Sequence, residues 1–378
     1  MISRVKRYIS QHLTNLPGWR TDRKIVVFES DDWGSIRMPS KQVYKQCLQA
    51  GYRVDKIAYE RFDSLASEDD LELLFNLLSG YNDQHGNPVV ITANILTANP
   101  DFEKIKSSGF QEYFYELITE TFNRYPKHSG CLNLWKEGKG KGVFFPQSHG
   151  REHLNVSGFM QALRQGDRDV HFGFEHSMPG SIPKGDPNGG NKMVESLRYV
   201  DQQDKEKKIS IIVEGLELFE NLMGYRSETF IPPNYLWSPD FNELISRKGV
   251  RFYQGQKKMI EPLLDGGVKL HTHKLGERND YGQTFLIRNA FFEPALCHHS
   301  TDDPVYRCLK DISTAFRMNK PAIISSHRLN YVGFIDEQNR DRNLKMLEQL
   351  LYQIIKKWPD VEFLNSVQLG NLIIAENG

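Results

Sequence analysis

The chain has 378 residues, which is more than one average domain of roughly 150 residues, although a single α/β barrel can reach this size. Charged residues make up 25% of it and hydrophobic residues 39%, a composition typical of globular proteins and not of disordered ones. Because 48 lysines and arginines balance 48 aspartates and glutamates, no broad field attracts nucleic acid, and we expect no nucleic-acid partner. No apolar run approaches the ~20 residues that cross a bilayer, so no transmembrane segment is expected.

The N-terminal segment, residues 1–20, lacks the apolar stretch that a secretory signal requires. Val5, Ile9 and Leu13 fall on one helical stripe, which predicts an amphipathic helix packed on the body of the protein. Association of this segment with a membrane surface is the alternative. The four cysteines form no close pair, which favours free thiols in a reducing compartment. We therefore expect a cytoplasmic protein, and the sequence leaves its oligomeric state open.

Apolar, β-branched runs alternate with helical patterns along residues 21–378. The runs that predict buried strands are 25–28, 89–92, 143–145, 229–231, 285–287, 322–324 and 361–364. Helical spacing of apolar residues is found in 71–78, 114–122, 211–222 and 344–354. This alternation predicts a single α/β domain with a mainly parallel sheet. About seven strand–helix units favour a barrel over an open sheet.

Two stretches interrupt the alternation. Residues 131–142 contain three glycines and are predicted to be a flexible loop. A Gly/Pro-rich excursion runs from Met178 to Lys192, within a loop insertion expected over about 178–208. Both are expected to be loop insertions near the barrel mouth, where long loops narrow a site and select its substrate.

The strongest local signal is the pair Asp31 and Asp32, which follows the first strand-like run directly. Parallel α/β folds place their active sites at the carboxyl ends of strands. Two adjacent carboxylates are not comfortably ionised there without a cation, so one of them is expected to bind a metal and the other to accept a proton. The alternative is a helix cap followed by a turn.

Two histidine signals follow later strand-like runs. His149 and His153 are four residues apart and can share one cation, with surface histidines in a loop as the alternative. His327 leaves a buried run near the end of the chain and can act as a general acid, with a structural histidine at a strand end as the alternative.

In this order, the three signals resemble the NodB-type polysaccharide deacetylases of carbohydrate esterase family four. Asp31 and Asp32 with Gly34 match the first motif of the family, and His149 and His153 match the spacing of its H-[ST]-x-x-H motif. The strand end at His327 matches the last motif loosely. The resemblance implies a deformed (β/α) barrel with about seven parallel strands, and metal-assisted removal of acetyl groups from a saccharide.

The resemblance also implies a role for each of these residues. Asp31 would be the general base, and His327 would protonate the leaving group. Asp32, His149 and His153 would hold a divalent metal, with zinc as the expected ion. The family places an arginine beside the base, but Ile231 occupies its position here, and Arg288, Arg328 or Arg226 could replace it.

Seven further residues are expected to contact an acetylated saccharide or glycan precursor: Trp33, Asn234, Tyr235, Arg288, Asn289, Glu293 and Arg328. The turn at Asn234 and Tyr235 is also expected to offer a backbone N–H to an oxyanion. The sequence does not distinguish N- from O-deacetylation. A metal-dependent amidase acting on a non-sugar and a catalytically inactive carbohydrate-binding barrel are the two alternatives, and the missing arginine is what favours the second.

Overall fold

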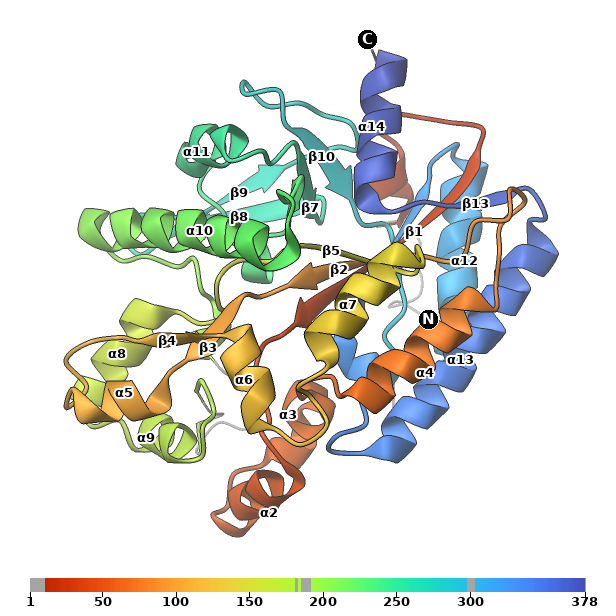
Figure 1. Cartoon of the computed structure of the whole chain (residues 1–378). Helices are drawn as coiled ribbons and strands as arrows, with labels where there is room; N and C mark the ends of the chain where they lie inside the picture. The colour runs from red at the N-terminus through yellow and green to blue at the C-terminus, as the bar shows by residue number, and fades with distance from the viewer. Residues whose placement is uncertain (1–10, 181–182, 185–191, 298–302, 378) are drawn as a thin grey trace, which may run out of the picture.

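The computed structural model describes residues 11–180, 183–184, 192–297 and 303–377, and a curled parallel sheet forms its centre (Figure 1). In spatial order its strands are β10 (Thr284–Ile287), β7 (Phe252–Gly255), β6 (Thr229–Phe230), β5 (Phe144–Ser148), β2 (Ile91–Ile95), β1 (Lys24–Trp33), β12 (Ala322–His327) and β11 (Ala290–Phe291), with β13 (Val361–Phe363) paired to β1. All pairs in this sheet are parallel. The predicted deformed barrel is therefore confirmed, with β7 and β11 in addition to the seven expected strands.

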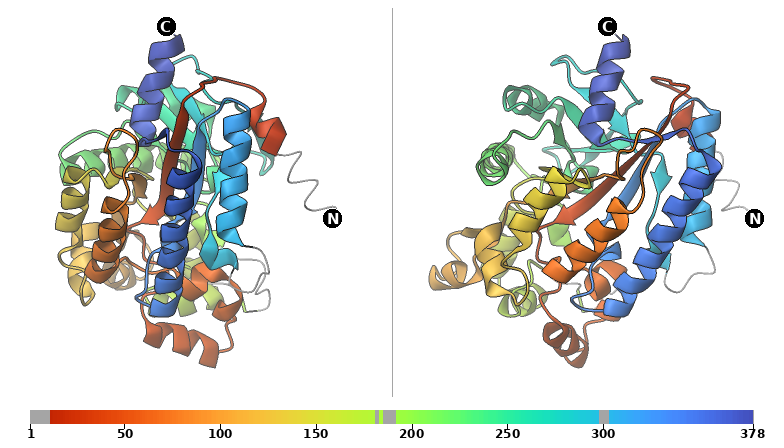
Figure 2. Two further views of the ribbon diagram at one scale, coloured as in Figure 1. Left: turned by 90° about the vertical axis from the view of Figure 1, so that its right-hand side faces the viewer. Right: turned by 45° about the vertical axis from the view of Figure 1, so that its right-hand side comes forward.

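Helices surround this sheet (Figure 2). Helix α7 (Cys131–Gly140) packs on β5 and α12 (Pro304–Arg317) on β11 and β12, and α4 (Glu68–Ser79) and α13 (Glu337–Lys357) pack on these two helices. Helix α10 (Gln202–Met223) also packs on β5 and is followed by α11 (Asn242–Arg247), while α14 (Ser366–Asn377) packs against β1, β7 and β10. Along β1, Val26 and Phe28 enter one hydrophobic cluster and Ile25 and Val27 another. Both faces of the strand are buried, which explains its uninterrupted apolar run.

Short elements gather at the end of the sheet to which the strand arrows point (Figure 1). They are α2 (Lys41–Gln49), α3 (Ala58–Phe62), β3 (Ala98–Pro100), α5 (Phe102–Ser107), β4 (Tyr115–Leu117), α6 (Ile118–Arg124), α8 (Val156–Arg164) and α9 (Arg168–Glu175). A separate hairpin is formed by β8 (Lys258–Pro262) and β9 (Val268–Thr272). The connection from β1 to α4, which contains α2 and α3, is the segment that matters most for the site.

The predicted loop at 131–142 is wrong, because residues Cys131–Gly140 form α7. Cys131, Trp135 and Gly138 are buried at helical spacing. A Cβ at Gly138 would lie 2.8 Å from the ring of Phe75 and 2.9 Å from Phe144. The glycine that suggested flexibility instead allows the helix to pack closely.

Two other predictions need correction. The predicted excursion 178–208 extends too far, because α10 begins at Gln202, where the Asp201 side chain caps it; residues 181–182 and 185–191 lie outside the described part. The helical pattern over 114–122 covers a strand and a helix: β4 pairs antiparallel with β3, and α6 begins only at Ile118.

The described part of the N-terminal segment, residues 11–20, contacts the body at several points. Asn289 donates to Asn15, and Lys320 donates to three backbone carbonyls of residues 17–19. Residues 1–10 lie outside the described part. No disulfide links the four cysteines, all of which lie in the described ranges. Within the described ranges, no helix is both long and apolar enough to cross a bilayer.

Candidate active site

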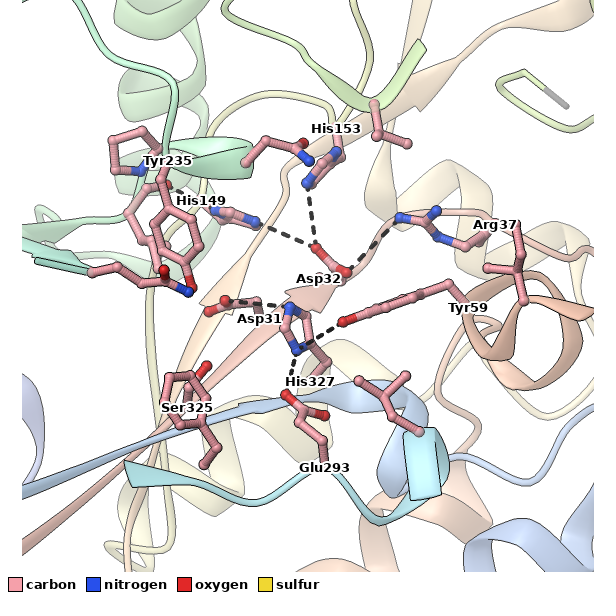
Figure 3. Close-up of a pocket in the computed structure, with 18 of the residues that line it drawn as sticks. Asp31, Asp32, Arg37, Tyr59, His149, His153, Tyr235, Glu293, Ser325 and His327 are labelled. Atoms are coloured by element: carbon pink, nitrogen blue, oxygen red, sulfur yellow. Dashed lines mark hydrogen bonds and ion pairs between the residues drawn. The ribbon is translucent and has the colours of Figure 1, made fainter. Parts of the chain in front are cut away.

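The polar residues predicted from strand ends meet at one edge of the sheet. Asp31 on β1 lies in register with His327 on β12, and β5 ends at Ser148, one residue before His149. Because every strand of the central sheet is parallel to its neighbours, all its carboxyl ends lie on the same side. A cavity of about 500 Å³ opens there (Figure 3). The predicted site residues that line it are Asp31, Asp32, His149, His153, Asn234, Tyr235, Glu293 and His327.

A bulge in β1 allows both aspartates to face this cavity. Neighbouring residues of a regular strand point to opposite faces of the sheet. The pairing of β1 with β2 shifts between Ser30 and Trp33, and Asp32 has a φ of 73°. A left-handed conformation at a non-glycine residue costs about 1–3 kcal/mol. The strain lies at the residue predicted to bind the metal.

Three side chains form a candidate metal centre. One ligand atom from each of Asp32, His149 and His153 lies within 4.8 Å of the other two. Oδ1 of Asp32 is 3.3 Å from Nε2 of His149 and 3.6 Å from Nε2 of His153. Gly150 follows His149 with a φ of 114°, which explains why glycine takes the small position of the His-x-x-x-His sequence.

The hydrogen bonding of His149 fits a cation at this point. Its Nδ1–H donates to the carbonyl oxygen of Ile231 at 2.8 Å, so Nε2 is the ring atom directed at Oδ1 of Asp32, 3.3 Å away. A backbone carbonyl that accepts from one ring nitrogen is the usual way in which a protein orients a histidine whose other nitrogen binds a metal. The donor set of two imidazoles and one carboxylate is one that zinc binds, with a further position open. Ile231, which stands where the family has an arginine, thus orients a ligand through its backbone.

Burial and local charge keep Asp32 and His153 in the protonation states that bind metals. Burial lowers the pKa of His153 to about 4, and His149 acts in the same direction, so the imidazole is neutral near pH 7. For Asp32, burial alone would raise the pKa, but the histidines and Arg37 outweigh it and hold the pKa well below its usual value.

Arg288 is the arginine that lies beside Asp31, a position for which the sequence left three candidates open. Its Nη1 and Nη2 donate to Oδ2 and Oδ1 of Asp31 at 2.6 and 2.7 Å, and its Nε donates to Glu29 at 2.6 Å. Burial alone would raise the pKa of Asp31, but Arg288 lowers it to about 2. Asp31 is therefore an oriented carboxylate at any ordinary pH. Arg288 was predicted as a substrate contact, but the structure uses its guanidinium to hold two carboxylates.

His327 lies on the other side of Asp31, with its Nε2 3.7 Å from Oδ2 of the aspartate. Its Nδ1–H donates to Oε1 of Glu293 at 2.6 Å, and the hydroxyl of Tyr59 lies 3.3 Å from the same nitrogen. Burial favours the neutral ring, but Glu293 and the two aspartates outweigh it and raise the pKa of His327 to about 9. The imidazole thus carries a proton at neutral pH, as a general acid must.

We expect the Glu293→Gln variant to lose much of this elevated pKa. In the metal-free wild type, the charge of His327 is present below pH 9 and is lost as the pH rises through about 9. Without the glutamate charge, burial pulls the pKa back toward 6.5, so the ring loses its proton at lower pH. NMR titration of the His327 ring protons measures the shift directly. An unchanged pKa would show that Glu293 does not set the charge of this ring.

Besides Arg288, three predicted substrate contacts do not line the cavity. Trp33 is buried, packs against Phe144 and donates to Ser30. Asn289 ties β12 to the N-terminal segment, since its amide bonds Asn15 and the backbone of residues 321 and 323. Arg328 is also fully buried and forms a two-pronged ion pair with Asp63. Each of these side chains is engaged in structural contacts instead.

The turn after β6 is strained where it reaches the cavity. Asn234 and Tyr235 have φ values of 55° and 56°, and both side chains line the cavity. The N–H of Tyr235 donates to the carbonyl oxygen of Pro232 at 2.9 Å. This bond occupies the N–H of Tyr235, which was one of the two expected oxyanion donors.

The sequence did not point to four other residues of the cavity wall: Arg37, Tyr59, Glu60 and Gln256. The first three belong to the connection between β1 and α4, which has no strand or helix pattern that would place them. Gln256 follows β7, a strand that was not predicted. Asn94, whose amide donates to Asp31 at 2.7 Å, had a usable signal, because it is polar within an otherwise apolar strand end.

No protein-family model matches the sequence, and no curated protein matches it. Similar solved structures include an allantoinase, with 11% identity over 96% of this chain and 92% of that one and a TM-score of 0.46. A "probable Polysaccharide deacetylase" from Pseudomonas aeruginosa has 10% identity over 93% of this chain and 91% of its own, with a TM-score of 0.45. A 4-alpha-glucanotransferase from Thermococcus litoralis has 10% identity and a TM-score of 0.45, and the match covers 92% of this chain but only 40% of that enzyme.

Proposed function

We propose that the protein is a hydrolase that depends on a divalent metal and removes acetyl groups from a saccharide or glycan precursor. The observation that carries the proposal is the convergence of Asp32, His149 and His153 next to a charged carboxylate and a charged imidazole. The arginine partner of Asp31, whose absence favoured an inactive barrel, is supplied by Arg288. This arrangement favours an enzyme over a binding module.

The residues divide the chemistry between them. A divalent cation held by Asp32 and the two histidines would supply a Lewis acid for the acetyl carbonyl. Asp31, fixed by Arg288, accepts the proton of the attacking water. His327, charged because of Glu293, gives its proton to the departing amine or alkoxide. A base held as an anion and an acid held as a cation lie 3.7 Å apart, so both proton transfers can serve one reacting centre.

The cavity wall supports a saccharide substrate. Tyr59, Pro232 and Phe291 offer apolar faces, and Asn234 and Gln256 offer amides. A pyranose has one apolar face and a rim of hydroxyl groups, and mixed walls of this kind suit it.

Elemental analysis of the purified protein, combined with an acetate-release assay on acetylated mono- and oligosaccharides, tests the proposal. We expect about one divalent ion per chain, which is what a single three-ligand site implies, and acetate release that a chelator abolishes. Bound metal without acetate release from any saccharide would favour an amidase acting on a non-sugar. A protein with neither metal nor turnover would favour the carbohydrate-binding alternative.

We further expect a soluble, short substrate. A cavity of about 500 Å³ is of the size that holds a small molecule. Acetate release should therefore not increase with chain length beyond short oligosaccharides, and chitin or xylan should be poor substrates. Rates that climb steadily with chain length would contradict this.

A further inference from the structure

The carboxylate of Asp32 faces a different partner with each of its oxygens (Figure 3). Oδ1 points to the Nε2 atoms of His149 and His153, at 3.3 and 3.6 Å. Oδ2 points away from both and lies 4.0 Å from Nη2 of Arg37. A carboxylate can bind a metal through one oxygen or through both. A guanidinium beside Oδ2 competes with the metal for that oxygen.

Two acidic residues hold Arg37 in this position. Its Nη1 lies 3.6 Å from Glu60, and its Nε lies 3.4 Å from Asp63. Asp63 is itself fixed, because Arg328 donates two hydrogen bonds to it at 2.8 and 3.2 Å. Only 14% of the Arg37 side chain is exposed, and it lines the cavity. This series of alternating charges leaves Arg37 little freedom to move away from Asp32.

We propose that Arg37 is a positioning residue that restricts Asp32 to one metal-binding oxygen and limits the affinity of the site for its cation. The inference rests on the proposed function, because it needs a cation at the three ligands. A second bound oxygen would fill a position that a catalytic site keeps open for substrate and water. A fixed positive charge next to a ligand also repels the cation, so Arg37 weakens metal binding while it keeps the site open.

The test is a variant that binds metal more tightly and turns over more slowly. In Arg37→Gln, we expect the apo protein to bind Zn²⁺ at least about tenfold more tightly, because a nearby positive charge is gone and Glu60 is left uncompensated. The kcat for acetate release should fall. In the Co²⁺-substituted protein, the visible absorption should weaken as the coordination number rises. Calorimetric titration with Zn²⁺ in the presence of a competing chelator measures the affinity independently of activity.

Two matched variants separate charge from geometry. Arg37→Lys keeps the charge, so its affinity for Zn²⁺ should stay close to that of the wild type. Arg37→Gln combined with Glu60→Gln removes one charge of each sign, so its affinity should also return toward the wild type, while its Co²⁺ spectrum should still show the higher coordination number. The double variant also carries the test if the single one fails to fold, because it leaves no unpaired buried glutamate.

The outcomes that overturn the inference differ from those that overturn the proposed function. A folded Arg37→Gln protein with unchanged or weaker Zn²⁺ affinity would contradict the role of the charge. An unchanged Co²⁺ spectrum in the double variant would contradict the role in orienting Asp32. A wild-type protein that binds no divalent metal would instead refute the proposed function itself.

Discussion

Asp31→Asn is expected to lower turnover by about 10²–10⁴-fold, the range that a general base contributes, and to leave the metal content unchanged. His149→Ala and His153→Ala are expected to lose both the metal and the activity. The difference follows from the geometry: Asp31 is bonded by Arg288 and Asn94 and is not among the three converging ligands. Asparagine keeps the shape of the side chain but cannot accept the proton.

Metal content is measured by elemental analysis of each purified variant, and turnover by acetate release. His85→Ala is a matched control, since 59% of the His85 side chain is exposed and it does not line the cavity. It should keep both properties. If Asp31→Asn also empties the site, then Asp31 is a ligand, and the proton acceptor has to be sought elsewhere.

Sequence reasoning was strongest where one regular element decides the position of a residue. Asp31, Asp32, His149 and His327 each lie at the end of an apolar run, and a parallel sheet brings such ends to one edge. The sequence therefore predicts that two polar groups far apart in the chain lie close together, even when no contact between them is known. The same argument would have found Asn94.

The incorrect predictions concern residues whose positions depend on tertiary packing or on an irregular backbone. The bulge at Asp32 turns both aspartates toward the cavity and leaves Trp33 in the core, and no simple alternation predicts that. The partner of Asp31 comes from a residue 257 positions away, and three arginines were open as candidates. Arg37 lies in a connection whose path depends on how α2 and α3 pack. Such contacts are specified by the folded chain and have no local sequence pattern.

His327→Ala is expected to lower turnover of an acetylated saccharide by about 10²–10⁴-fold with the metal content intact. The reason is that an amine or alkoxide leaves poorly without a proton, and the ring that carries one lies 3.7 Å from Asp31. An aryl acetate has a leaving group that is stable as an anion, so its hydrolysis needs little help from an acid. The effect of the substitution should therefore shrink strongly on that substrate.

Comparing the two substrates distinguishes a proton donor from a structural residue. His327 also bonds Glu293, which accepts a hydrogen bond from Asn330 at 2.6 Å, so the substitution could disturb this corner of the cavity. A disturbance of that kind would slow both substrates alike, because both need Asp31 and the metal ligands in place. An equal loss on the saccharide and on the aryl acetate would thus argue against the acid role, whereas a loss confined to the poor leaving group requires a proton delivered by His327.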